Sequence, residues 1–174
     1  RPASATEDQL IATSNGSATI HQGVEAGLNA VLWENQNGDS VALRQAYTYN
    51  DFHYRNDPVF GANELPGLPR QVYQAELQYR QATGFYAQLN ARAASSYYVD
   101  FANTLSAPSY VLWGAKIGYE APSKKWEVFV DARNLTNQRY ATAANTTYDA
   151  KGQDSANFFP GDPFNVTTGV AYHF

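Results

Sequence analysis

The stretch that most constrains the fold is residues 164–174, Phe-Asn-Val-Thr-Thr-Gly-Val-Ala-Tyr-His-Phe. Every second side chain from the first phenylalanine onward is apolar or aromatic, apart from one threonine, and the intervening side chains are small or polar. A period of two residues is typical of a β-strand and not of a helix. The stretch is also about as long as a tilted strand that crosses a bilayer. On this stretch alone, a membrane strand and the last strand of a soluble β-sandwich both remain open.

The composition is compatible with a β-barrel and not with membrane helices. Hydrophobic residues make up 44% of the chain, but the mean hydropathy is −0.49. No window approaches the roughly 18 consecutive apolar residues of a membrane-spanning helix. Alternation within strands lowers the mean hydropathy, so this value does not argue against a barrel. Phe, Trp and Tyr together reach 14%, and aromatic girdles at the two membrane interfaces would account for them.

Seven segments alternate as long strands should. We predict strands at residues 19–34, 41–54, 70–81, 85–99, 110–120, 126–140 and 164–174. Gln45 interrupts the apolar side of the second segment and predicts a β-bulge there. The segment from Asn134 to Asn137 should disturb the register of the sixth. Residues 1–16 are small and polar, and we predict a loop or the remnant of a preceding strand.

The connections between these segments are sorted by length. Short turns follow the first, third and fifth segments, at 35–40, 82–84 and 122–125, and longer loops follow the second, fourth and sixth, at 55–69, 100–109 and 141–162. Short periplasmic turns and long outer loops are the arrangement of bacterial outer-membrane barrels. A soluble sandwich has no reason to sort its loops in this way. We therefore predict an all-β fragment of an antiparallel transmembrane barrel, with about seven long meander strands forming an open curved sheet.

Seven strands, an odd number, do not close into a bacterial barrel by themselves. Bacterial single-chain barrels have an even number of strands, and an unpaired edge is untenable in lipid. Two arrangements satisfy this requirement: an eight-stranded barrel with a degenerate strand in residues 1–16, or the C-terminal part of a larger barrel. The sequence has neither a start methionine nor a signal peptide, which favours the larger barrel.

Other functional classes find little support in the sequence. A net charge of −4 argues against a nucleic-acid partner. The absence of cysteine excludes disulfides, thiolate metal sites and a cysteine nucleophile. His21, His53 and His173 have no second ligand at metal-binding spacing, so we predict neither a metal site nor a cofactor. No Gly-x-Ser-x-Gly motif occurs, and we do not expect an enzyme.

Several motifs resemble those of one known family. Residues 128–140, Val-Phe-Val-Asp-Ala-Arg-Asn-Leu-Thr-Asn-Gln-Arg-Tyr, resemble the Asn-Leu-(Thr/Phe)-(Asn/Asp)-x-x-Tyr segment near the end of TonB-dependent outer-membrane receptors. Residues 159–174 look like the closing Pro-Gly segment of that family, which ends in an aromatic residue. His-Gln-Gly-Val-Glu at 21–25, Ala-Tyr-Thr-Tyr-Asn at 46–50 and Leu-Pro-Gly-Leu-Pro at 65–69 are similar to upstream segments. These matches keep the family order along nearly the whole chain.

The resemblance implies a barrel of about 22 strands around a plug, located in the bacterial outer membrane. It implies uptake of an iron–siderophore or a similar scarce nutrient. Residues 1–174 would then be the C-terminal part of the barrel, without the plug domain. The partners implied are outer-membrane lipid, the barrel assembly machinery, the imported ligand, and TonB through the missing N-terminal part. A small autonomous outer-membrane barrel with a structural or adhesive role and a soluble β-sandwich binding module remain as alternatives.

Two sets of residues are candidates for function. We expect ligand recognition in the long loops and the upper lumen, where aromatic rings can stack on flat groups and arginine can pair with carboxylates. The ligand candidates are Tyr54, Arg55, Asn56, Phe60, Tyr97, Tyr98, Asn145, Tyr148, Phe158 and Phe159. The terminal strand resembles the signal that the barrel assembly machinery reads. Its residues are Phe164, Val166, Val170, Tyr172 and Phe174.

Overall fold

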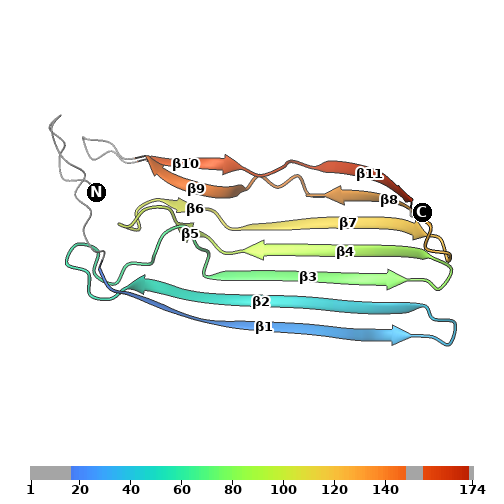
Figure 1. The fold of residues 1–174 in the computed structure, drawn as a ribbon. Coiled ribbons are helices and arrows are strands. Elements are labelled where there is room, and N and C mark those ends of the chain that lie inside the picture. The colour runs from blue at the N-terminus through green and yellow to red at the C-terminus, as the bar shows by residue number, and fades with distance from the viewer. Residues whose placement is uncertain (1–16, 148–154, 173–174) are drawn as a thin grey trace.

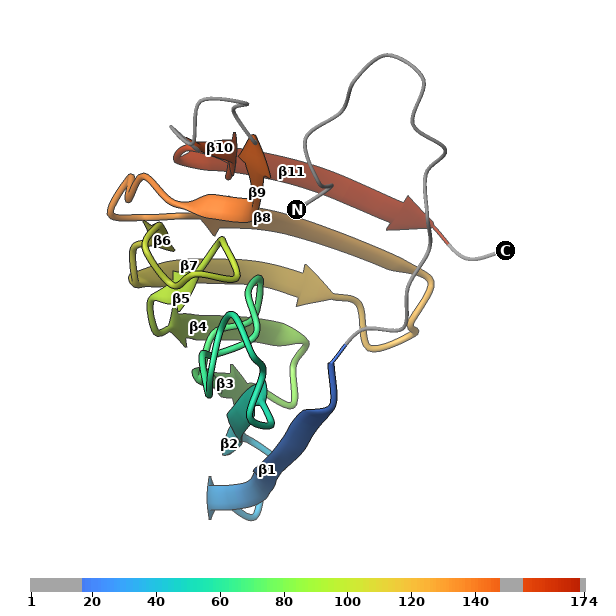
Figure 2. The same ribbon diagram turned by 90° about the vertical axis from the view of Figure 1, so that its left-hand side faces the viewer.

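The computed structural model describes residues 17–147 and 155–172, which form one curved antiparallel sheet and two small hairpins (Figure 1). The sheet has seven strands, which lie in the order β1 (Thr19–Glu34), β2 (Ser40–Tyr54), β3 (Gln71–Arg80), β4 (Phe85–Ala94), β7 (Tyr110–Glu120), β8 (Trp126–Arg133) and β11 (Asn165–Tyr172). In Figure 2 the strands follow one another in a single layer from β1 to β11. The predicted all-β, antiparallel, seven-stranded sheet is confirmed.

The two faces of the sheet differ in chemistry because the register continues from strand to strand. One face, called the apolar face, has Leu43 opposite Leu77 and Leu77 opposite Leu89. The other, called the polar face, has Arg44 opposite Glu76 and Lys116 opposite Asp131. Side chains of the apolar face are exposed rather than packed into a core, as Ile117 at 53% and Val170 at 78% illustrate. The sheet therefore presents its apolar side outward, as a strand layer in lipid does.

The short turns and the long loops lie at opposite ends of the sheet. In Figure 1 the three tight connections are on the right, whereas both extra hairpins and the 55–70 loop are on the left. This end is called the loop end below. The predicted sorting of connections by length is thus present in the structure. No helix long and apolar enough to cross a membrane occurs within residues 17–147 and 155–172.

The β-bulge predicted at Gln45 is wrong. β2 pairs with β3 without a register shift, and Gln45 lies opposite Ala75. The amide of Gln45 is instead satisfied across the strands, because the Tyr73 hydroxyl donates a hydrogen bond to its Oε1 at 2.9 Å. A polar side chain on the apolar face therefore needs no bulge when a neighbouring tyrosine supplies its partner.

The irregularity of the sheet lies in β1. The register against β2 shifts between Val31 and Trp33, which leaves Leu32 as the extra residue. The shift brings Trp33 opposite Val41, a residue of the apolar face. Three consecutive apolar side chains cannot all lie on the apolar face of a regular strand, and the bulge moves the largest of them away from the polar face.

Two predicted strands end early. β4 stops at Ala94 rather than at residue 99, and β8 stops at Arg133 rather than at residue 140. Asn134 and Asn137 have left-handed φ values of 50° and 49°, which break the extended backbone after β8. The predicted disturbance at 134–137 is confirmed, but it ends the strand rather than shifting its register.

Two of the predicted loops contain hairpins. β5 (Tyr97–Tyr98) pairs with β6 (Ser106–Ala107), where residues 100–109 were expected to be a loop. β9 (Ala141–Thr147) pairs with β10 (Ser155–Pro160) inside the expected 141–162 loop. β5 and β6 have two residues each, and β9 and β10 show no apolar alternation, so the sequence pattern did not indicate separate hairpins here.

Candidate functional site

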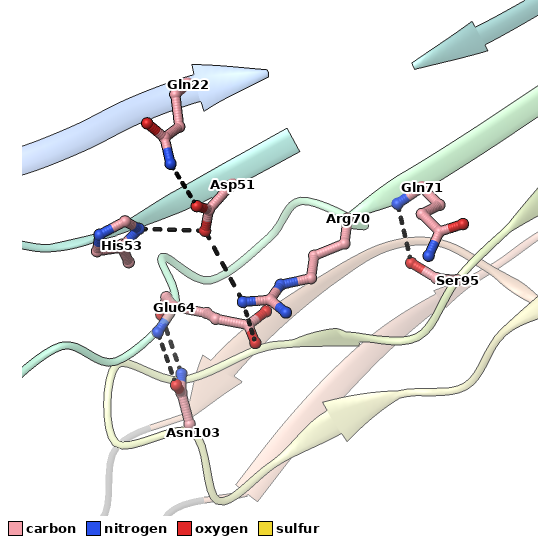
Figure 3. A network of polar contacts seen from close by, with 8 residues as sticks. All are labelled: Gln22, Asp51, His53, Glu64, Arg70, Gln71, Ser95 and Asn103. Carbon is pink, nitrogen blue, oxygen red and sulfur yellow. Dashed lines mark hydrogen bonds and ion pairs between the residues drawn. The ribbon is translucent and has the colours of Figure 1, made fainter. Parts of the chain in front are cut away.

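The loop between β2 and β3 is held at both of its ends by a polar network (Figure 3). Asp51 accepts a hydrogen bond from Nε2 of Gln22 at 2.7 Å and lies 3.2 Å from Nδ1 of His53. The guanidinium of Arg70 bridges two carboxylates, 3.2 Å from Glu64 and 3.8 Å from Asp51. The residues that leave β2 and those that enter β3 are thus fixed to one another.

The same network joins this loop to the segment between β5 and β6. The backbone N–H of Glu64 donates to Oδ1 of Asn103 at 2.8 Å, and Nδ2 of Asn103 donates to the carbonyl of Glu64 at 2.9 Å (Figure 3). Asn103 has a φ of 57°, a conformation that asparagine tolerates better than most residues. Two loops that are 39 residues apart in sequence therefore form one unit.

Asp100 organises the second of these loops. It is 5% exposed, and its carboxylate accepts hydrogen bonds from the backbone N–H of Thr104 at 3.0 Å, the backbone N–H of Leu105 at 2.8 Å and the hydroxyl of Thr104 at 2.8 Å. Burial by itself would raise the pKa of Asp100. The hydrogen bonds outweigh burial and hold that pKa below its ordinary value.

The 100–105 loop should therefore loosen in acid. A lowered pKa means that Asp100 contributes stability fully above its unfolded pKa of about 4 and loses it as the pH falls through the lower folded value. Hydrogen exchange of peptides covering 100–105, corrected for intrinsic rates, should show constant protection from pH 7 to about 4.5 and declining protection below. D100N should be less protected at pH 7 and should lack this acid-dependent decline. An equal decline in both proteins would contradict the assignment.

Three aromatic rings meet above the end of β2, and we call them the aromatic cluster. Tyr54 stacks on Phe60 with ring centroids 5.6 Å apart, and Phe101 lies 6.2 Å from Tyr54 and 5.9 Å from Phe60. Tyr54 and Phe60 were predicted ligand residues, whereas Phe101 was missed. An aromatic residue within a long loop was the signal that selected Phe60, and it applies equally to Phe101. The cluster offers flat apolar surfaces, of which Phe101 is 37% exposed.

Phe60 is positioned by a tight turn. Oδ1 of Asp57 accepts hydrogen bonds from the backbone N–H of Val59 at 2.7 Å and of Phe60 at 2.6 Å. Backbone bonds also run in both directions between Asp57 and Gly61 at 2.8 and 2.9 Å. A hydrogen bond from the Ser17 hydroxyl, together with these backbone bonds, lowers the pKa of Asp57. The anionic Asp57 carboxylate is the acceptor of the hydrogen bonds that place Phe60 in the turn.

The other predicted ligand residues are distributed over the loop end. Arg55 and Asn56 are exposed directly after Tyr54. Tyr97 and Tyr98 form β5 and, with Arg70 and others, line a hollow of about 280 Å³.

The remaining ligand candidates belong to the β9–β10 hairpin. Asn145 lies on β9 and both Phe158 and Phe159 lie on β10, where they are 42% and 48% exposed. Within the described residues, no ring contact joins them to the aromatic cluster. Tyr148 lies outside the described residues. The structure thus brings together Tyr54 and Phe60 of the ten candidates and leaves this hairpin as a separate group.

The predicted assembly residues follow the terminal strand. Val166, Val170 and Tyr172 are 51%, 78% and 57% exposed, and Val166 and Val170 lie opposite Ala132 and Val128. Phe164 precedes β11 and is 48% exposed. Phe174 lies outside the described residues. A role of these side chains in barrel assembly stays a prediction.

The polar face carries two grooves. One of about 610 Å³ lies over β1 to β4, and one of about 420 Å³ lies over β4, β7 and β8 and reaches Asn165 of β11. In the parts of the chain that the structure describes, no three His, Cys, Asp or Glu side chains are grouped so that they could hold a metal ion. The groove linings include Gln74, Asn90 and Arg92, which can form hydrogen bonds and ion pairs.

The family to which such a sheet belongs is given by sequence comparison. The family described as "TonB dependent receptor-like, beta-barrel" matches residues 2–135. The chain belongs to the TonB-dependent receptors. In outer-membrane barrels one strand face is apolar and turned to lipid and the other faces the interior, and the two faces of this sheet differ in the same way.

Individual TonB-dependent receptors are similar in sequence and fold. The ferrioxamine B receptor of Salmonella typhimurium is 31% identical over 116 residues, which are 62% of this chain and 16% of that protein. The solved siderophore receptor PiuA from Acinetobacter baumannii superposes with a TM-score of 0.69 at 22% identity, over 88% of this chain and 22% of that one. The ferric yersiniabactin uptake receptor FyuA from Yersinia pestis gives 0.66 at 19% identity, over 87% and 23%. The two superpositions establish the fold alone.

Proposed function

We propose that this chain is the C-terminal portion of the barrel of an outer-membrane receptor that imports an iron–siderophore complex or a similar scarce nutrient, with energy from the TonB complex. The observation that carries the proposal is the aromatic cluster, held at the loop end above a polar inner wall. It combines flat apolar surfaces with a rigid scaffold, the arrangement by which proteins bind small ligands at low entropic cost. The chain spans only 16% of the ferrioxamine B receptor, so ligand, energy source and transport belong to the whole receptor.

The loop contacts support a recognition role. Binding residues are commonly found on loops that a rigid scaffold positions. Here Asn103 and Glu64 couple the two loops that supply Phe60 and Phe101. A ligand that contacts one loop would therefore find the second loop already in place. This lowers the entropic cost of ordering the loops when the ligand binds.

Uptake by the full-length receptor tests the proposal. A strain lacking its own siderophore receptors should grow on at least one defined iron chelate when it carries the receptor, and this growth should require TonB. The double variant F60A/F101A should weaken binding of that chelate by about tenfold or more, because buried aromatic contacts dominate binding energy. V59A, which removes a 78% exposed side chain from the same loop, is the matched control. Growth on no chelate, growth that is independent of TonB, or equal affinities of the two variants would contradict the proposal.

A further inference from the structure

One cation on the polar face has no charged partner among the residues that the structure describes. Within residues 17–147 and 155–172, each of the other arginine and lysine side chains on the polar-face strands lies near a carboxylate. These pairs are Arg44–Glu76 at 3.8 Å, Arg80–Glu120 at 3.2 Å, Lys116–Glu127 at 3.7 Å and Arg133–Asp131 at 2.9 Å. Arg92 of β4 is exposed, and no ion pair joins it to a described residue. Among the described residues, Arg92 is thus the cation of these strands that has no carboxylate beside it, and its guanidinium can pair with an external anion.

Arg92 stands where the two grooves of the polar face meet. It lines both the 610 Å³ and the 420 Å³ groove, close to the loop end of its strand, which finishes at Ala94. Its cross-strand neighbours are uncharged, Gln74 on β3 and Leu112 on β7. No described acidic neighbour directly across the strands competes with an incoming anion for this guanidinium.

Gly114 lines the groove beside Arg92, and the Asn90 side chain lies close above it. A Cβ at this position would lie 2.6 Å from Oδ1 of Asn90, so the floor of the groove cannot carry a larger residue without moving that amide. Asn90 lies directly opposite Gly114 and is exposed to the groove. The amide side chains of Gln88, Asn90 and Asn165 give the lining further hydrogen-bond donors.

The groove holds one guanidinium that no described carboxylate pairs with. Its lining contains three cations and two carboxylates, namely Arg92, Lys116, Arg133, Asp131 and Asp162. Arg133 and Lys116 are already paired, which leaves Arg92 as the free donor. A guanidinium presents two parallel N–H groups that match the geometry of a carboxylate.

We propose that Arg92 and the adjoining groove bind a carboxylate of the imported chelate, so that the receptor favours anionic over cationic iron complexes. This inference rests on the proposed function and specifies the class of substrate. Arg92 was not among the residues selected from sequence, because a single arginine on an alternating strand looks the same whether it is paired or free. The aromatic cluster would hold the flat part of the complex, and Arg92 its charged part.

Binding of two probes to the full-length receptor tests the inference. Ferric citrate carries free negative charge, whereas ferrioxamine B carries an ammonium group. R92Q should weaken the affinity for ferric citrate by about tenfold, the usual scale for losing one charge-assisted contact. R92K should fall between R92Q and the wild type, since it keeps the charge but loses the paired donors. Affinity for ferrioxamine B should stay the same or increase.

K125Q is the matched control, because it removes one exposed cation from the short turn at the opposite end. Its affinities should equal those of the wild type. The inference is overturned if the wild type does not bind ferric citrate, if R92Q and K125Q behave alike, or if R92Q weakens both probes equally. Binding that depends on Arg92 but is followed by no TonB-dependent uptake would instead overturn the proposed function and leave the anion site standing.

Discussion

Replacing Gly84 by alanine should destabilise the barrel by about 3 kcal/mol or more. Gly84 ends the turn between β3 and β4 with a φ of 109°, a region that residues with a Cβ rarely enter, at a cost of about 1–2 kcal/mol. A Cβ at this position would also lie 2.0 Å from the carbonyl oxygen of Glu120 on β7. The obstacle is backbone rather than a flexible side chain, so the turn or the strand must move.

The movement would also break a bond between strands. The backbone N–H of Glu120 donates to the carbonyl of Gly84 at 2.9 Å, and this bond holds the turn against β7. Urea unfolding of the full-length receptor, followed by its heat-modifiable migration on gels, should give a lower midpoint for G84A. G67A is the control, because Gly67 has a φ of 88° but no atom within 4 Å of a built Cβ. G67A should lose only the stability that the positive φ costs an alanine. If G67A and G84A lose the same free energy of unfolding, the close approach of the Cβ to the Glu120 carbonyl does not matter.

The strands that were predicted well are those whose pattern is local. β1 and β7 have the predicted bounds because their side chains alternate over most of the length and a turn signal follows each of them. The bulge in β1 was not predicted, although three apolar residues in a row at 31–33 cannot all lie on the apolar face of a regular strand. The β-bulge at Gln45 was predicted wrongly because the hydrogen-bond partner of Gln45, the Tyr73 hydroxyl, lies on another strand.

The site was predictable only in part for the same reason. Tyr54 and Phe60 could be selected as aromatic residues at the loop end, but their contact with Phe101 depends on the hydrogen bonds between Asn103 and Glu64. Those bonds join segments that share no sequence pattern. Likewise, the free guanidinium of Arg92 becomes apparent only when every neighbouring charge has been paired in space. The local periodicity of the sequence thus predicts the strands and the faces of the sheet. Contacts between loops can be identified only in the folded structure.

Asn134 is expected to be the most sensitive side chain after β8. It is 6% exposed and has a φ of 50°. Its Oδ1 accepts from the backbone N–H of Gln138 at 2.8 Å, and its Nδ2 donates to the carbonyls of Gln138 and Asp162 at 2.9 Å each. One side chain thus closes the 134–138 turn and fastens it to the segment that leads into β11.

N134A should therefore lower the free energy of unfolding by about 4 kcal/mol. Each of the three hydrogen bonds contributes about 1 kcal/mol, and alanine is additionally strained in the left-handed region. N134G loses the same hydrogen bonds, but glycine adopts the left-handed backbone without strain. It should therefore be about 1 kcal/mol more stable than N134A. The difference between these variants separates the side-chain contribution from the backbone contribution.

Asn137 provides the matched comparison for Asn134. It has nearly the same φ, 49°, but is exposed, and its Oδ1 accepts one hydrogen bond, from the N–H of Phe164 at 3.0 Å. N137A should therefore cost about half as much as N134A in urea titrations of the full-length receptor. If the two alanine variants unfold at the same urea concentration, the links to Gln138 and Asp162 do not stabilise the entry into β11. In that case the strain of the left-handed backbone alone accounts for the loss.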